Sequence, residues 1–372
     1  MKLKLFCDPN YLSEGMPYES ILYPFWGKPS ENSDSPQSGM FDNYIEISSD
    51  LFEMSPLEEA DLAIVPSNWE PILSCGVPNL SIQFVEKVKQ AGKLSVSFFG
   101  GDCSHIELPI ESDLVFRNSL YRSVRKSNDF AMPAGSEDFV KKYFDNQICI
   151  RKKQSKPVVG FCGFAAQNNL KTYIKLFLYK GKKFLLKDRL VIPPYNIGHV
   201  LRTQALPILS KDSRITTNFI QRERPVFFNE PDSTLIKKLR MEFVQNMVES
   251  DYMFCCRGSG NYSFRFYEAL SCGRIPVFID TDCVLPYDFE IDWKKYCVWL
   301  DESELPLIAE KIAEFHENLS PQEFVDLQHE CRRVWEQRIA PEGFFANLHR
   351  HIPRVRYAQE RKHPILTEVS TG

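Results

Sequence analysis

The sequence predicts an α/β protein made of two successive parallel-sheet units. The first observation is length, because 372 residues exceed the roughly 250–300 at which a single hydrophobic core stops growing. The second is alternation: short apolar or β-branched runs are separated by segments with helical periodicity, as in a parallel sheet with crossover helices. The third is a break at residues 151–157, a charged stretch that predicts a linker.

Each unit is predicted from its own series of strand-like runs. In the first unit these are residues 2–6, 60–66, 93–99 and 112–116, with a helix at 81–93. In the second unit they are 156–164, 214–220, 250–256, 273–279 and 295–300, with a helix at 233–249. Helices at 304–319, 321–339 and 341–352 begin at Ser or Pro signals. We divide the chain into domains 1–152 and 153–340 and a tail, 341–372, and expect the last helices to pack back on the first domain.

Composition narrows the classes of partner. The chain is 43% hydrophobic and 25% charged with a net charge of −4, so nucleic acid is not an expected partner. The N-terminal apolar run is broken at Cys7, Asp8 and Pro9, which is not the pattern of a signal peptide, and no window approaches the ~18 apolar residues of a membrane span. Eleven cysteines without C-x-x-C spacing favour reduced thiols. We expect a cytoplasmic protein without a bound metal or cofactor, and leave peripheral membrane attachment open.

The segment from 250 to 300 contains the residues most suited to chemistry. It reads as a buried strand, a glycine-bearing turn, a helix capped by Ser263 and a second strand after Gly273. The N-terminus of such a helix accepts phosphate. Arg265 and Glu268 are three residues apart on this helix and share a face, and they suit a pyrophosphate and two ribose hydroxyls respectively. The alternative is an exposed salt bridge between the two side chains.

Residues 257–300 resemble the signature of the exostosin-like glycosyltransferases. In that family a glycine-containing loop, Ser, Arg, Glu-Ala, Gly, Ile-Pro-Val, Asp, Leu-Pro and Asp-Trp recur in the order found here, and weaker likeness covers most of 60–300. The resemblance implies a GT-B architecture, in which two Rossmann-like domains face each other across a cleft. It also implies inverting, metal-independent transfer from a nucleotide sugar. The chain departs from the family at Ser271 to Arg274, where small residues and then Gly-Cys are usual. The identity of the donor's sugar and of its nucleotide base therefore stays open.

The resemblance assigns roles to individual residues. It implies that Arg265 binds the diphosphate, that Glu268 binds the ribose, and that Ser263 and the preceding loop bind the phosphates. The loop residues are Arg257, Gly258, Gly260, Asn261 and Tyr262. Arg202 could reach the donor phosphates or be a solvated helix residue. The expected substrates are a UDP-linked sugar and a glycan or lipid-linked acceptor.

The acceptor side is predicted from the first unit. Inverting transfer needs a base near the acceptor hydroxyl. Asp102 and His105 follow a strand and two glycines in FFGGDCSH, so they are the candidates. Asp102 could instead form a turn or cap a helix, and His105 could be structural. The aromatic residues between 18 and 26 could be a platform for sugar rings or a local core; they are Tyr18, Tyr23, Phe25 and Trp26.

Two rival functions remain open. Asp280 and Asp282 form a D-x-D pattern, by which a metal-dependent GT-A transferase would hold Mn²⁺ or Mg²⁺. That fold, however, has one nucleotide-binding unit and an early D-x-D. The other rival is a transferase-like protein that only binds a sugar or a partner, although such a protein has no physical need for the Arg265 and Glu268 pair.

Overall fold

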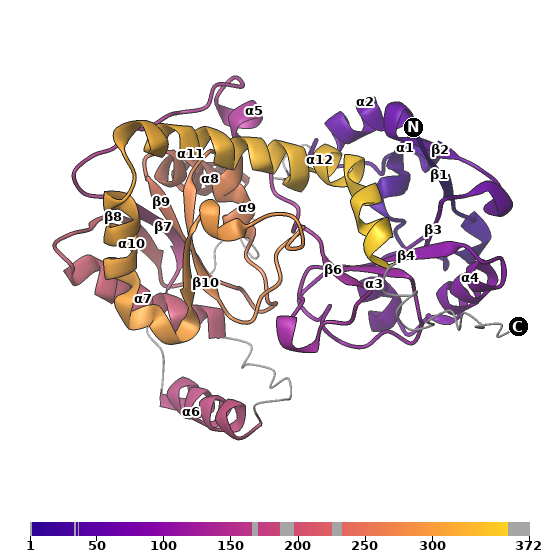
Figure 1. Cartoon of the computed structure of the whole chain (residues 1–372), viewed down its shortest axis with the longest axis horizontal. Helices are drawn as coiled ribbons and strands as arrows, with labels where there is room; N and C mark the ends of the chain where they lie inside the picture. Colours follow the sequence, from indigo (N-terminus) through magenta and orange to yellow (C-terminus); the bar gives the residue numbers. More distant parts are fainter. Residues whose placement is uncertain are drawn as a thin grey trace, which may run out of the picture.

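The structure is a computed structural model, and it describes residues 2–32, 35, 37–165, 170–186, 197–224 and 233–355. In these residues the chain forms two parallel sheets with helices packed against them (Figure 1). One sheet is built from the N-terminal part of the chain and the other from the C-terminal part. The predicted α/β class with two Rossmann-like units is therefore confirmed.

The first sheet has six strands in the order β2-β1-β3-β4-β5-β6, all parallel. Its strands are β1 (Leu3–Phe6), β2 (Phe52–Met54), β3 (Leu62–Ile64), β4 (Leu94–Phe99), β5 (Leu114–Arg117) and β6 (Asp129–Ala131). The four predicted strand runs are all present. The edge strands β2 and β6 were not predicted, because three residues are too few to show a periodicity.

Helices cover this sheet with their apolar faces. They are α1 (Tyr23–Trp26), α2 (Asp42–Leu51), α3 (Trp69–Ser74) and α4 (Asn79–Gln90). In α4 the buried residues Phe84, Val85 and Val88 recur at helical spacing. They pack on Ala63 of β3 and on Val65, which follows β3. Their burial fixes α4 on the sheet.

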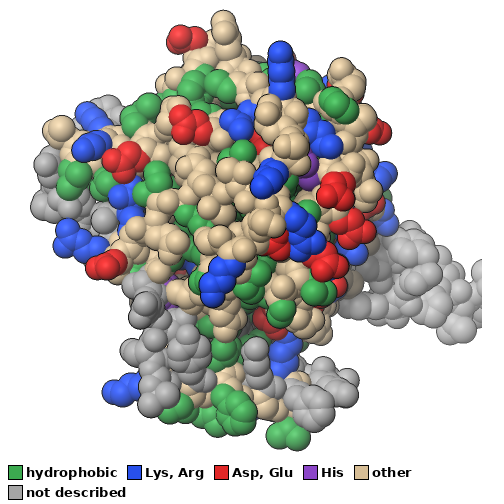
Figure 2. All heavy atoms as spheres, turned by 90° about the vertical axis from the view of Figure 1, so that its left-hand side faces the viewer, with side chains coloured by type: hydrophobic (Ala, Val, Ile, Leu, Met, Phe, Trp, Pro, Cys, Tyr) green, Lys and Arg blue, Asp and Glu red, His purple; other side chains and the backbone are tan. Residues whose placement is uncertain are grey.

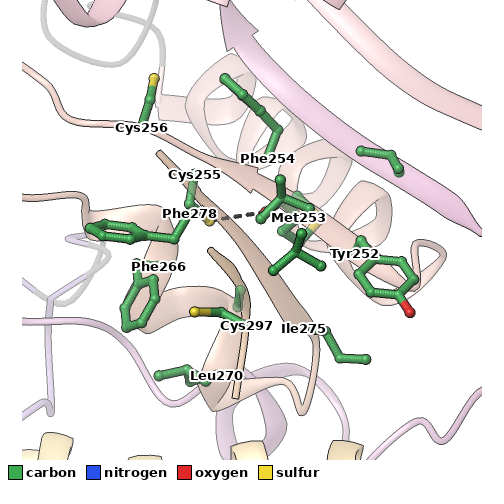
Figure 3. Packing of buried hydrophobic residues seen from close by; sticks show 14 of the residues in the cluster. Tyr252, Met253, Phe254, Cys255, Cys256, Phe266, Leu270, Ile275, Phe278 and Cys297 are labelled. Atoms are coloured by element: carbon green, nitrogen blue, oxygen red, sulfur yellow. Dashed lines mark hydrogen bonds between the residues drawn. The ribbon is translucent and has the colours of Figure 1, made fainter. Parts of the chain in front are cut away.

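The second sheet has five strands in the order β11-β10-β9-β7-β8, again all parallel. Its strands are β7 (Val158–Phe164), β8 (Thr216–Arg222), β9 (Tyr252–Cys255), β10 (Ile275–Asp280) and β11 (Val298–Asp301). Every residue of β9 and β10 is buried. Figure 3 shows Phe266 packed against Phe278, with ring centroids 5.2 Å apart, on the side of the sheet to which Cys255 of β9 points, whereas Phe254 of β9 points to the other side. Central strands buried on both faces explain their continuous apolar sequence.

The second domain is surrounded by a larger set of helices. They are α5 (Phe139–Tyr143), α6 (Leu170–Leu185), α7 (Ile197–Lys211), α8 (Ser233–Val248), α9 (Phe264–Ser271), α10 (Ile308–Glu317) and α11 (Pro321–Val334). Phe139 of α5 lies in the same core as β9 and β10, although it precedes the predicted linker. No helix of the described residues is long and apolar enough to cross a membrane.

The C-terminal helices cross from the second domain to the first. A π-helical turn, Trp335–Ile339, continues α11 and leads to α12 (Pro341–Ala346). Phe345 of α12 packs against Tyr44 of α2 with ring centroids 4.5 Å apart, and Phe344 packs against Phe116. Figure 1 shows this crossing along one side of the molecule. The predicted return of the last helices to the first domain is confirmed.

The carboxyl ends of the two sheets face each other. Tyr121, which follows β5, forms an antiparallel bridge with Cys283, which follows β10. The amide of Arg122 donates to the carbonyl of Asp282 at 2.9 Å, and the amide of Val284 donates to Leu120. Ligands of open parallel sheets bind at the carboxyl ends of the strands. The junction of the two domains is therefore where we look for a site.

Candidate functional site

Helix α9 begins at this junction, directly after the loop that follows β9. Ser263 occupies the N-cap position with extended backbone, but its side chain makes no hydrogen bond to the first turn. The predicted capping bond is therefore absent. Gly273 has a φ of 66° just past the end of the helix, as predicted, which a glycine adopts without strain. The result is a short helix whose N-terminal N–H groups and Ser263 hydroxyl are not used up by a side-chain cap.

Arg265 lies on the first turn of α9 and points toward β7. Its Nη2 donates to the carbonyl of Cys162 at 2.8 Å, and its guanidinium lies over the rings of Phe161 at 4.7 Å and Phe243 at 5.6 Å. Its Nε has no hydrogen-bond partner among the described residues. Burial, together with the nearby charge of Arg202, lowers the pKa of Arg265. The side chain is a partly buried cation with donors left over.

Glu268 is held by a partner that the sequence did not indicate. Its Oε1 accepts from Nη2 of Arg240 at 3.3 Å, and the same nitrogen donates to Glu137 at 2.5 Å. Arg240 comes from α8 and rests on the ring of Phe139. Since Glu268 pairs with Arg240 and Arg265 with a carbonyl, the alternative of a mutual exposed salt bridge is wrong. Arg240 and Glu137 carry no motif, and only the fold brings them here.

Arg202, on α7, lies close to Arg265. Its Nη1 and Nη2 lie 3.5 Å from the carbonyls of Phe164 and Arg257, at the limit of hydrogen bonding. The side chain is partly buried, so it is not a freely solvated helix residue. Gly198, one turn earlier, permits this approach, because a Cβ there would lie 2.0 Å from the carbonyl of Arg257. Two guanidinium groups thus converge beside the end of β7.

The loop before α9 is fixed against the first domain by two buried side chains. Arg257 donates to the Asn261 side chain at 3.1 Å and to the Tyr121 hydroxyl at 2.9 Å. The Asn261 amide group donates to the carbonyls of Leu120 and Asp282. Asn261 has no exposed surface and Arg257 almost none. These contacts make both residues positioning groups of the loop, whereas direct donor contacts were predicted.

The predicted acceptor residues lie on the opposite wall of the junction. Gly260 sits so close to Asp102 that a Cβ would be 2.8 Å from its carboxylate. The Tyr262 hydroxyl hydrogen-bonds this carboxylate. Burial of the hydroxyl, and next the negative charge of Asp102, raise the pKa of Tyr262. His105 packs edge-on against Tyr121 at 5.6 Å, and burial lowers its pKa. The fold thus brings Asp102 and His105 close to the loop before α9.

Two further carboxyl groups at this sheet edge were not predicted. The Glu70 carboxylate overlies Gly101, where a Cβ would be 1.9 Å away. Glu19 is buried, hydrogen-bonds Asn68, and has its pKa raised to about 8 by burial. Asn68 in turn accepts from the amide of Gly100 at 2.9 Å. No pattern in the sequence marks Glu19, because its position depends on the contact of the loop after β1 with the loop after β3.

The aromatic residues between 18 and 26 form a cluster near Glu19. Tyr18 packs edge-on against Tyr23 and Trp26, with centroids 5.8 and 5.5 Å apart. Phe25 and Trp26 pack against the core of the first domain. All are partly buried, so the cluster is a local core with an exposed side.

The D-x-D carboxylates are occupied by protein donors. Asp280 accepts from the amide of Cys283 at 2.8 Å and from Arg122 at 3.1 Å. Asp282, at a φ of 68°, accepts from the amide and hydroxyl of Ser123. The described residues hold no group of three His, Cys, Asp or Glu side chains placed to bind a metal. A 540 Å³ pocket beside Asp280 is lined by Arg122, Trp293 and Trp299 among others, and it includes neither Arg265 nor Glu268.

Two facing Rossmann-like domains joined by a C-terminal helical crossover define the GT-B class. Among solved structures, sucrose-phosphate synthase from Thermosynechococcus elongatus matches with a TM-score of 0.38 and 8% identity over 96% of this chain and all of that one. The catalytic domain of starch synthase IV from Arabidopsis thaliana has a TM-score of 0.33 and 11% identity over 90% and 80% of the two chains.

Sequence comparison finds proteins that are similar to part of this chain. Residues 198–314 match the Exostosin GT47 domain. Exostosin-1 of Drosophila melanogaster is 26% identical over 198 residues, which are 52% of this chain and 24% of the relative. A probable glucuronosyltransferase of Oryza sativa subsp. japonica is 22% identical over 226 residues, 55% of this chain and 52% of the relative. The resemblance to the exostosin-like glycosyltransferases is confirmed, and its family-model match covers residues 198–314. The chain spans about half or less of the length of these relatives.

Proposed function

We propose that the protein is an inverting, metal-independent glycosyltransferase. It moves a sugar from a nucleotide-diphosphate donor, UDP-linked, to a glycan or lipid-linked acceptor, and takes part in polysaccharide synthesis. The observation that carries this proposal is Arg265. It is a partly buried cation at the N-terminus of α9, next to Arg202, and its Nε has no hydrogen-bond partner in the part of the chain that the structure describes. Unfilled donors of two arginines beside free helix N–H groups suit a diphosphate.

The donor side follows from these positions. Arg265, Arg202 and the α9 N-terminus neutralise the negative charge that develops on the departing diphosphate, and in a partly buried site such stabilisation is strong. The Ser263 hydroxyl, which makes no cap bond, donates to a phosphate oxygen. Glu268, oriented by Arg240 through one oxygen, binds the ribose hydroxyls. Because Arg257 and Asn261 fix the loop, these groups are preorganised before the donor binds.

The acceptor side supplies the base. In inverting transfer the acceptor oxygen loses its proton to the base and attacks the anomeric carbon, while the bond from that carbon to the diphosphate breaks. Asp102 and His105 are the candidates, on the wall opposite α9. The lowered pKa of His105 keeps its imidazole neutral near pH 7, so it can accept a proton. The Asp102 carboxylate can do so after releasing Tyr262.

Calorimetric titration with UDP tests the donor site. We expect binding by the wild type and a Kd weakened by about 10- to 100-fold in Arg265→Ala and in Glu268→Ala, because charge-assisted hydrogen bonds contribute about 1.5–3 kcal/mol. Arg214→Ala and Glu249→Ala are matched controls on exposed side chains away from the junction, and they should bind as the wild type does. Absence of UDP binding by the wild type defeats the proposal.

Two further measurements address the rival functions. A non-catalytic sugar-binding protein would bind UDP yet release no UDP from any sugar donor. Release of UDP from at least one member of a panel of nucleotide sugars would therefore exclude this rival function. A metal-dependent transferase would lose activity in EDTA. Asp280 and Asp282 are already bonded to Arg122 and Ser123, which supports activity that EDTA leaves unchanged.

The cytoplasm is our proposed location. All eleven cysteines are free thiols, and Cys75, Cys103 and Cys149 are exposed. Exposed thiols suit a reducing compartment, whereas oxidising compartments favour disulfides. Fluorescence microscopy of a tagged full-length protein checks this, and a signal enclosed in secretory organelles would contradict it.

A further inference from the structure

Helix α6 exposes a continuous apolar stripe. Ile174, Phe177, Leu178 and Leu185 recur at spacings of three, four and seven residues, so they lie on one face of the helix. All four are exposed, with Phe177 at 78% and Leu185 at 79% of their full surface. Scattered single apolar residues on a surface are ordinary, but a contiguous stripe marks an interaction surface.

The opposite face of α6 is packed, so the orientation of the stripe is fixed. Leu176 is buried against Ile197 and Val200 at the start of α7, with Tyr179 beside it. Figure 1 shows that α6 stands apart from the two sheets, whereas α7 packs close to the second one. In Figure 2, hydrophobic side chains gather at the lower end of the molecule, where α6 lies. The stripe therefore points away from the protein body.

The charge of α6 selects the kind of partner. Residues 170–186 contain five lysines and no Asp or Glu, while the whole chain has a net charge of −4. Lys171, Lys175 and Lys182 lie next to the stripe at helical spacing. Lys183 pairs with Glu302, so the helix is also tied to the domain by charge. A second copy of such a helix would bring lysines against lysines and is disfavoured.

An anionic bilayer complements both features. A helix with an exposed apolar stripe and flanking lysines lies in the membrane interface, with its apolar face in the headgroup boundary and its lysines at anionic headgroups. We propose that α6 docks the protein onto the surface of an anionic lipid bilayer. In chain order α6 comes after β7, whose Cys162 carbonyl accepts a hydrogen bond from Arg265, and before α7, which carries Arg202. Leu176 of α6 packs against the start of α7. Docking through α6 would place the proposed donor site close to the membrane.

Vesicle co-sedimentation of the full chain tests the docking surface. The probes are phosphatidylcholine vesicles with and without phosphatidylserine, at low and high salt. We expect the wild type to sediment with the anionic vesicles only, and more weakly at high salt, because salt screens the lysines. Lys175→Gln with Lys182→Gln should lower the partition coefficient by about 30-fold. Phe177→Ser with Leu178→Ser and Leu185→Ser should lower it by at least about 100-fold.

Matched controls separate docking from general surface effects. Ile47→Ser with Val77→Ser and Met241→Ser removes exposed apolar residues elsewhere, and Lys152→Gln with Lys156→Gln removes the same charge. Both should sediment like the wild type, and circular dichroism checks that every variant is folded. A wild type that ignores anionic vesicles overturns the proposal, as do stripe variants that bind them normally. So does a dimer, seen by light scattering, that the stripe variants abolish. Vesicle binding needs no donor, so failure to bind UDP would defeat only the proposed transferase reaction.

Discussion

Arg265 should contribute little to stability without a ligand and much to UDP binding. In Arg265→Met the unbranched apolar side chain keeps the contacts with Phe161 and Phe243. It loses one charge-assisted hydrogen bond to Cys162, about 1.5–3 kcal/mol, and two cation–π contacts of about 0.5–1 kcal/mol each. It also relieves the burial cost that lowers the pKa of Arg265. These effects oppose each other, so we expect a change in unfolding free energy within about 1 kcal/mol.

The effect of the ligand should be the opposite. At a UDP concentration 100 times its Kd the wild type gains about 2.7 kcal/mol of stability. If Arg265→Met weakens binding about 100-fold, the same concentration equals its Kd and stabilises it by only about 0.4 kcal/mol. Chemical unfolding with and without UDP measures both quantities. A loss of more than about 2 kcal/mol without UDP would show that Arg265 is mainly structural, and an undiminished UDP effect would refute its role in donor binding.

Three further outcomes are expected. Burial among Phe116, Phe130 and neighbouring rings lowers the pKa of His351 to about 3, so stability should fall as pH drops from about 6.5 toward 3, by about 2 kcal/mol at pH 5. His351→Leu should remove that slope in urea unfolding; an unchanged slope contradicts the burial of a neutral imidazole. Burial raises the pKa of Glu19 to about 8, so stability should fall as pH rises from about 4.5 to 8. Glu19→Gln should abolish this dependence and be the more stable protein at pH 8, and equal curves for both proteins would argue against a protonated Glu19. Asp282→Ala removes acceptors of Ser123 and places alanine at a φ of 68°, which should cost about 1–3 kcal/mol in thermal unfolding. Loss of activity without loss of stability would instead favour a metal role for Asp282.

Much of the fold could be predicted because its signals are local. Fully buried strands such as β9 and β10 are continuous apolar runs, and α4 shows its buried face by spacing alone. Short elements were not predicted, because they contain too few residues for such a local signal. The edge strands β2 and β6 have three residues each, and a run of that length has no readable period.

The candidate site divides in the same way. Arg265 and Glu268 could be found because one helix turn and an ordered motif place them together. Their partners could not. Arg240 reaches Glu268 from another helix, and Glu137 reaches Arg240 from 103 residues away in the chain. Asn261, predicted to touch the donor, instead bonds Leu120 and Asp282, because the first domain closes over its loop.

By itself the sequence determined the α/β class, the strands of both units other than β2 and β6, and the helix that carries Arg265 and Glu268. These depend on periodicity and on residues a few positions apart, whose geometry the backbone sets. Only the tertiary structure decided which groups face each other across the junction. In the tertiary structure the D-x-D carboxylates accept hydrogen bonds from Arg122 and Ser123, and the apolar stripe of α6 is exposed. Such pairings join residues far apart in the chain, and they form only when the packing of both domains has fixed their distances.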